Sequence, residues 1–138
     1  MMSQSRSGTM PRVDGVRVLV VDDCAANREL VTATLERSGA TVTAVSCAER
    51  ALEVVTRERP DVLVSDIEMP DKDGFWLIGQ VRALPPQRGG TTPAVALTGL
   101  ADAEDRARVL RGGFQYHVAK PVDIWALVGV VAILALKE

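Results

Sequence analysis

The chain has 138 residues, a length that suits one domain and is too short for two ordinary ones. Hydrophobic residues make up 47% of it and aromatic residues only 4%, so its apolar mass is mostly Ala, Val and Leu. That content is enough to form a core and excludes disorder over most of the chain. The net charge of −2 argues against binding nucleic acid through bulk charge, and we expect no direct nucleic-acid contact.

The first residues show no periodic pattern. Residues 1–14 contain Ser, Arg and Gly and lack the apolar stretch of a signal peptide, so we expect a flexible tail ahead of one domain over 15–138. Two cysteines, Cys24 and Cys47, are too few for a disulfide scaffold. We expect them to be semi-buried and unpaired in a reducing, cytoplasmic setting, although strand neighbours could bring them close enough for a redox pair.

From Val16 onward, short apolar runs alternate with longer segments of helical spacing. The runs predict strands over 16–21, 41–45, 62–64, 94–97 and 114–119. The segments between them predict a helix ending before Gly39 and helices over about 48–59, 74–84, 103–111 and 124–136. Crossover helices between apolar strands imply a parallel sheet covered on both faces, and a doubly wound α/β fold with five strands suits this length.

The first helical segment shows a stripe of residues expected to face the core. This stripe consists of Leu30, Val31, Thr34 and Leu35.

The last helical segment, over 124–136, carries no charge. A helix of this length spans about 20 Å, less than the roughly 30 Å of a bilayer core, so we expect no membrane insertion. Beside an inner stripe it carries Trp125, Val128, Ala132 and Ala135, which we interpret as an outer face that packs against a partner.

Polar side chains follow four of the predicted strands. Asp22 and Asp23 follow the first strand, Asp66 the third, Thr98 the fourth and Lys120 the fifth. Because the carboxyl ends of parallel strands meet at one edge of a sheet, these groups should lie together where ligands bind in such folds. Three neighbouring carboxylates repel one another unless a cation shares the site, and all-oxygen ligands suit Mg²⁺. With an ammonium and a hydroxyl added, the set fits phosphoryl transfer to a carboxylate nucleophile.

Four motifs in this order resemble those of bacterial two-component receiver domains. They are VLVVDD ending at Asp23, SDIEMP beginning at Ser65 with Asp73-Gly74, LTG around Thr98 and AKP around Lys120. The resemblance covers about 16–136, and the ordered set is far more specific than any single motif. It implies a flavodoxin-like sheet with strand order 2-1-3-4-5.

The resemblance implies a phosphoacceptor and a metal site. Asp66 is the expected phosphoacceptor and an Mg²⁺ ligand. Asp23 would bind the ion directly, Asp22 directly or through water, and Glu68 through its backbone carbonyl. Mg²⁺ is the one cofactor that we expect.

The resemblance also implies the groups that contact the phosphoryl oxygens. Thr98 would donate a hydrogen bond to them, Lys120 would pair with them, and the peptide before Pro121 would be cis. Receivers usually carry Tyr or Phe as a rotamer switch three residues before this lysine, and here that position holds His117. We keep two interpretations open: His117 acts as the switch, or it is a partly exposed strand residue without that role. Tyr116 should point to the opposite face.

By resemblance, the chain is a signalling domain rather than a conventional enzyme. It would accept a phosphoryl group from a sensor histidine kinase or phosphotransfer protein and change partner binding through the fourth helix, fifth strand and fifth helix. That face is also the expected surface of a homodimer. The stretch before the fifth helix looks most like the receiver of a hybrid histidine kinase.

Two alternatives remain. His117 and Glu68 leave room for a receiver-like interaction module that works without phosphorylation. A haloacid-dehalogenase-type phosphatase also uses an aspartyl nucleophile with Mg²⁺, Thr and Lys. In that class, however, the nucleophile precedes the acid pair in the chain, and here it follows.

Overall fold

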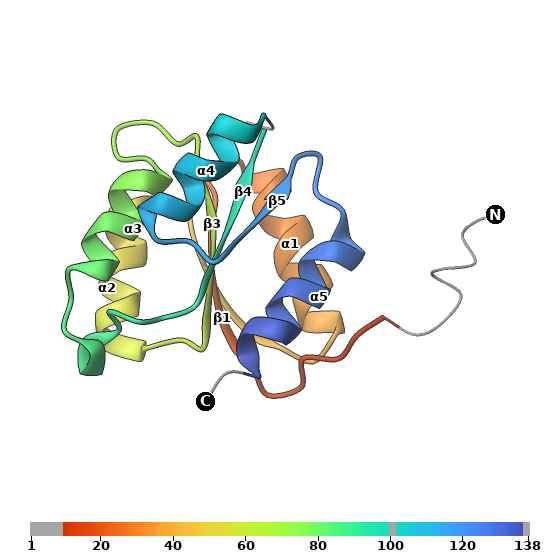
Figure 1. The fold of residues 1–138 in the computed structure, drawn as a ribbon. Coiled ribbons are helices and arrows are strands. Elements are labelled where there is room, and N and C mark those ends of the chain that lie inside the picture. The colour runs from red at the N-terminus through yellow and green to blue at the C-terminus, as the bar shows by residue number, and fades with distance from the viewer. Residues whose placement is uncertain (1–9, 100–101, 137–138) are drawn as a thin grey trace.

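The computed structural model describes residues 10–99 and 102–136, which form a parallel five-stranded sheet (Figure 1). Its strands are β1 (Arg17–Val21), β2 (Thr41–Val45), β3 (Val62–Asp66), β4 (Ala94–Thr98) and β5 (Tyr116–Ala119). Their order is β2-β1-β3-β4-β5, and every neighbouring pair is parallel. The doubly wound, flavodoxin-like fold with strand order 2-1-3-4-5 is therefore confirmed.

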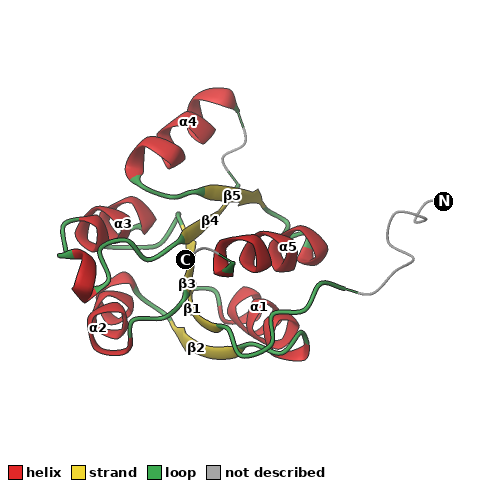
Figure 2. Cartoon of the chain, turned by 60° about the horizontal axis from the view of Figure 1, so that its bottom comes forward, coloured by secondary structure: helices red, strands yellow, loops and turns green. Residues whose placement is uncertain are grey.

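Helices cover both faces of the sheet (Figure 2). They are α1 (Ala25–Arg37), α2 (Ala48–Glu58), α3 (Gly74–Arg82), α4 (Ala103–Gly112) and α5 (Ile124–Ala135), with a short 3-10 turn, η2 (Pro86–Arg88). α1 and α5 lie on one face, α2 and α3 on the other, and α4 contacts α3 and β5. No helix in the described ranges is both long and apolar enough to cross a membrane.

The alternation of side chains along each strand produces two separate cores. On β1, Leu19 and Val21 pack toward α2 and α3, whereas Val18 and Val20 pack toward α1 and α5. Successive strand side chains point to opposite faces, so a strand buried on both sides must be apolar throughout. β3 and β4 are buried at every position, and both run past their apolar residues to end on a polar one.

Four positions on α1 and α5 differ from the expected helix faces. Leu30 is 48% exposed, because the buried stripe of α1 consists of Val31, Thr34 and Leu35, and the residue before Val31 turns toward solvent. Val128, expected on the outer face of α5, is completely buried beside Leu127. Ala132 and Ala135, expected on the same face, are half-buried against the core under α1 and α5. An almost wholly apolar helix lacks the contrast that would identify its inner face from sequence.

The chain packs against the domain before β1 begins. Val13, expected within the tail, is 2% exposed and belongs to the core under α1 and α5. Its backbone N–H donates to the Ser38 carbonyl over 2.9 Å. Residues 1–9 of the expected tail lie outside the described residues.

Candidate functional site

The strand register brings the polar residues to one edge of the sheet. Val21, the residue before Asp22, pairs with Ser65, the residue before Asp66. Asp66 in turn pairs with Leu97, the residue before Thr98. Asp22 is therefore level with Asp66, and Thr98 lies one residue further along β4, so these polar residues meet where the parallel strands end.

Three carboxylates form a compact cluster at this edge. Ligand oxygens of Asp22, Asp23 and Asp66 lie within 4.8 Å of one another. Asp22 is completely buried: its Oδ1 accepts a hydrogen bond from the Cys24 backbone N–H over 2.9 Å, while its Oδ2 is buried without a hydrogen-bond partner. A buried carboxylate oxygen without a donor is costly, and a hard cation would satisfy it. The donor set therefore fits Mg²⁺.

Asp66 is the most constrained carboxylate of the cluster. It is 1% exposed, and the Lys120 ammonium donates to its Oδ1 over 2.7 Å. Burial raises the pKa of Asp66 to about 6; Lys120 opposes this rise, and the neighbouring Asp22 and Asp23 add to it. Burial lowers the pKa of Lys120, but the hydrogen bond and charge of Asp66 outweigh this effect and leave the pKa above its usual value. Without a cation, the ammonium alone balances the clustered negative charge only in part.

Thr98 is held by a neighbour that the sequence did not indicate. It is completely buried, and its hydroxyl donates to Oε2 of Glu68 over 2.8 Å. We expected Glu68 to act through its backbone carbonyl. The structure shows that its side chain reaches across the site to the end of β4, and the role of its carbonyl stays a prediction.

Comparisons with known proteins show the family of this chain. A family model described as the response regulator receiver domain matches residues 18–132.

The chain belongs to this family.

Individual relatives include an uncharacterised 14.6 kDa protein of Leptolyngbya boryana, 49% identical over 83% of this chain and 86% of the relative. The sensor histidine kinase RcsC of Salmonella typhi is 34% identical over 88% of this chain but only 12% of its own length, so the chain matches a small part of that kinase. The crystal structure of the receiver domain of the sensor histidine kinase PA1611 of Pseudomonas aeruginosa has a TM-score of 0.81 and 28% identity. It covers 89% of this chain and 99% of that one, and is described with a magnesium ion coordinated in its active-site cleft.

The receiver's expected switch position on β5 is only partly exposed. Nε2 of His117 is buried without a hydrogen-bond partner, while Tyr116, its neighbour, is 39% exposed. The two side chains therefore differ in environment, as the alternation along a strand predicts. The Lys120–Pro121 peptide is cis, as expected.

Two further residues fix where α3 lies. A Cβ on Gly74 would lie 2.5 Å from the Asp66 carbonyl oxygen, so only glycine lets α3 begin this close to the end of β3. Arg82, which no sequence motif indicates, donates to the carbonyls of Gly90 and Gly113 over 2.8–3.0 Å. It thereby ties α3 to the segments that lead into β4 and β5.

The two cysteines are free and exposed, so the expectation that they are semi-buried is wrong. Each is the residue before a helix, Cys24 before α1 and Cys47 before α2. This position leaves their side chains outside both cores.

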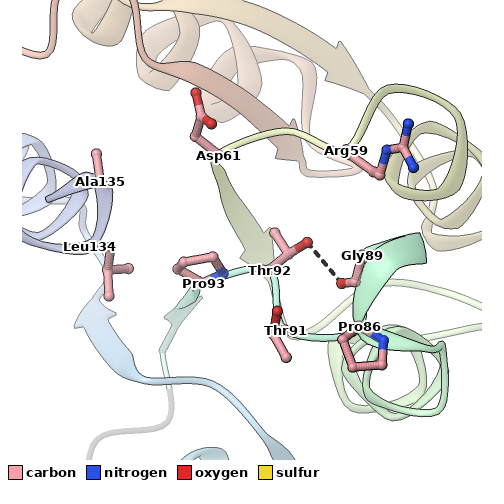
Figure 3. Close-up of a pocket in the computed structure, with 9 residues that line it drawn as sticks. All are labelled: Arg59, Asp61, Pro86, Gly89, Thr91, Thr92, Pro93, Leu134 and Ala135. Atoms are coloured by element: carbon pink, nitrogen blue, oxygen red, sulfur yellow. Dashed lines mark hydrogen bonds between the residues drawn. The ribbon is translucent and has the colours of Figure 1, made fainter. Parts of the chain in front are cut away.

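A cavity of about 310 Å³ lies at the other edge of the sheet (Figure 3). Its lining residues come from the segment before β3, the segment around η2 and the end of α5: Arg59, Asp61, Pro86, Gly89, Thr91, Thr92, Pro93, Leu134 and Ala135. Its two charged side chains already bond to the protein, since Arg59 donates to the Gln87 carbonyl and Asp61 accepts from the Arg17 N–H. Asp61 precedes β3 and Pro93 precedes β4, whereas the carboxylate cluster lies where the strands end, so the cavity is separate from it.

Proposed function

We propose that Asp66 accepts a phosphoryl group in a Mg²⁺-dependent reaction, and that this modification switches partner binding. The observation that carries the proposal is the buried Asp66 carboxylate, which contacts Lys120 and lies beside the orphaned oxygen of Asp22. An anionic nucleophile in this setting has the charge-balancing groups that phosphoryl transfer needs.

In the proposed reaction, a carboxylate oxygen of Asp66 attacks the phosphorus of a phosphohistidine. A P–O bond forms, the P–N bond breaks, and the electron pair stays on the histidine nitrogen of the donor. Asp22, Asp23, Asp66 and the Glu68 backbone carbonyl would hold Mg²⁺, which when bound neutralises phosphoryl charge. Hydrolysis of the acyl phosphate by water returns the carboxylate.

Thr98 and Lys120 complete the proposed phosphoryl site. The Lys120 ammonium already contacts Asp66 and would follow the added charge outward. The Thr98 hydroxyl would turn toward a phosphoryl oxygen, and the change at β4 would reach α4, β5 and α5. His117 is the proposed switch residue on β5, and Pro121 shapes the chain after Lys120.

The kinase relatives support a sensor histidine kinase or a phosphotransfer protein as the partner. The proposed domain spans 15–138, with Val13 adding to its core and a tail before it. We place it in the cytoplasm, either alone or as the receiver of a hybrid kinase. A homodimer would form through the α4, β5 and α5 face, where Leu110 and Ile133 are more than half exposed. The proposal includes no direct contact with nucleic acid.

The test is phosphorylation by acetyl phosphate with Mg²⁺, followed by intact mass. Wild-type protein should gain one phosphoryl group, and Asp66→Asn should gain none. Asp61→Asn is the matched control, because this exposed carboxylate lies at the opposite edge of the sheet. It should be labelled as well as wild type. Labelling that persists in Asp66→Asn would refute the proposed acceptor.

A receiver that signals without phosphate remains the second candidate. The observation in its favour is that the Glu68 carboxylate already engages the Thr98 hydroxyl. This candidate is preferred if three samples bind the partner equally well. They are Asp66→Asn, untreated wild type, and wild type treated with acetyl phosphate. The family match and the order of the acid residues both favour a receiver over a haloacid-dehalogenase-type phosphatase.

A further inference from the structure

The Glu68 side chain binds the Thr98 hydroxyl, which in the proposed switch turns toward the phosphoryl group. Thr98 ends β4 and is completely buried, whereas Glu68 is exposed on the loop two residues after Asp66. The hydrogen bond between them, 2.8 Å long, joins this loop to β4. Lys120 reaches Asp66 separately, over 2.7 Å, so the two contacts engage different partners.

A hydroxyl has one proton to donate, and a carboxylate can only accept it. The Thr98 hydroxyl therefore cannot donate to Glu68 and to a phosphoryl oxygen at the same time. We propose that Glu68 is a positioning residue that holds the Thr98 hydroxyl away from the acceptor until a phosphoryl group arrives. This inference rests on the proposed function of Asp66.

The charges around the acceptor explain how the contact would open. A phosphoryl group adds a charge of about −1.5 to −2. Glu68 lies close enough to Lys120 that its charge helps to raise the pKa of that ammonium, so it also lies within range of charge added at Asp66. Repulsion would drive the exposed Glu68 side chain toward solvent while the phosphoryl oxygens attract the released hydroxyl. Lys120 needs no such release, because it already points at Asp66.

Glu68 thus opposes the phosphorylated state in two ways, through competition for a proton and through like charge. Glu68→Gln keeps an acceptor oxygen and removes the charge, whereas Glu68→Ala removes both. Thr98→Val has nearly the same shape as threonine but no hydroxyl, so it removes the competition alone. A double-mutant cycle of Glu68→Ala with Thr98→Val separates the two effects.

The experiment titrates the phosphoryl analogue beryllofluoride into the protein with saturating Mg²⁺, following Trp76, which lies in the first turn of α3. Glu68→Ala should lower the midpoint concentration by about tenfold, the effect of a hydrogen bond to a charged group. In the Thr98→Val background the same change should lower it by no more than about twofold. Glu68→Gln should lie between wild type and Glu68→Ala. Glu53→Ala, an exposed carboxylate on α2, controls for net charge and should leave the midpoint unchanged.

Two failures are distinguishable. If wild type gains no phosphoryl group from acetyl phosphate, the proposed function fails, and this inference fails with it. If wild type is labelled but Glu68→Ala lowers the midpoint equally with and without the Thr98 hydroxyl, Glu68 acts through charge alone and the positioning role is wrong. An unchanged midpoint in Glu68→Ala overturns the inference as well. A methyl NMR signal of Thr98 that shifts in unphosphorylated Glu68→Ala would support the contact directly.

Discussion

Removing the charge of Asp66 should stabilise the metal-free protein near neutral pH. The side chain is 1% exposed, and its pKa is raised from 3.8 to about 6 mainly by burial. The folded and unfolded pKa values thus differ by about two, and a difference of one corresponds to about 1.4 kcal/mol in the free energy of ionisation. We therefore expect Asp66→Asn to increase the free energy of unfolding by about 3 kcal/mol when the wild-type carboxyl is ionised.

The pH dependence follows from which state holds the proton more tightly. The folded protein protonates Asp66 at a higher pH than the unfolded chain does, so this group lowers wild-type stability as pH rises from about 4 to about 6. Below that window Asp66 is neutral in both states and resembles asparagine. The stability difference between variant and wild type should therefore grow from near zero at about pH 4 to its full value above about pH 6.

The assay is urea denaturation in EDTA at several pH values, followed by tryptophan fluorescence. Groups remote from Asp66 titrate alike in both proteins and cancel in the difference, and Lys120 stays protonated throughout this pH range. Asp61→Asn controls for the loss of an exposed carboxylate: its amide oxygen can still accept the Arg17 N–H, so its stability should stay within about 1 kcal/mol of wild type and should show no rise between about pH 4 and about pH 6. A variant that is less stable than wild type above about pH 6, or a difference that does not change with pH, would refute the argument that burial of Asp66 is costly.

Three further substitutions test the surroundings of the site. Asp23→Asn should weaken Mg²⁺ binding by about tenfold or more, measured by calorimetry, because it removes a carboxylate from the cluster; unchanged affinity would exclude Asp23 as a ligand. Gly74→Ala should lower the free energy of unfolding by about 2 kcal/mol, measured by thermal unfolding, because the added Cβ would overlap the Asp66 carbonyl. A variant as stable as wild type would contradict that geometry. Arg82→Ala should lower the free energy of unfolding by about 2–3 kcal/mol, measured by urea denaturation, because the hydrogen bonds to Gly90 and Gly113 are lost. Arg82→Lys should recover only part of this loss.

The carboxylate cluster was predictable because the topology follows from the pattern of strands and helices. Once β1, β3, β4 and β5 are parallel neighbours, polar residues after their apolar runs must meet at one edge. The proximity of Asp22, Asp23 and Asp66 thus follows from sequence, and the structure places their ligand oxygens within 4.8 Å. The assignment of chemical roles still depended on resemblance to a family.

Side-chain contacts across loops could not be predicted in the same way. Glu68 has a flexible, exposed side chain, and no periodic pattern indicates that it turns back to Thr98. Leu30 and Val128 were assigned to the wrong faces of α1 and α5 because neighbouring apolar residues left the position of each stripe open. The role of Arg82 depends on two carbonyls that come together only after β4 and β5 have paired.

The separation of the two cores has a consequence for how this domain can diverge. Leu35 lies in the core under α1 and α5, and Leu77 in the core under α2 and α3, with the sheet between them. Substitutions in separate regions usually have additive effects on stability, so one layer can change without compensation in the other. Selection on one helical face, for a new partner, can therefore proceed while the opposite face is conserved. β1 and β3 contribute side chains to both layers and lead into the acidic cluster, so a substitution that shifts either strand would affect both layers and the site together.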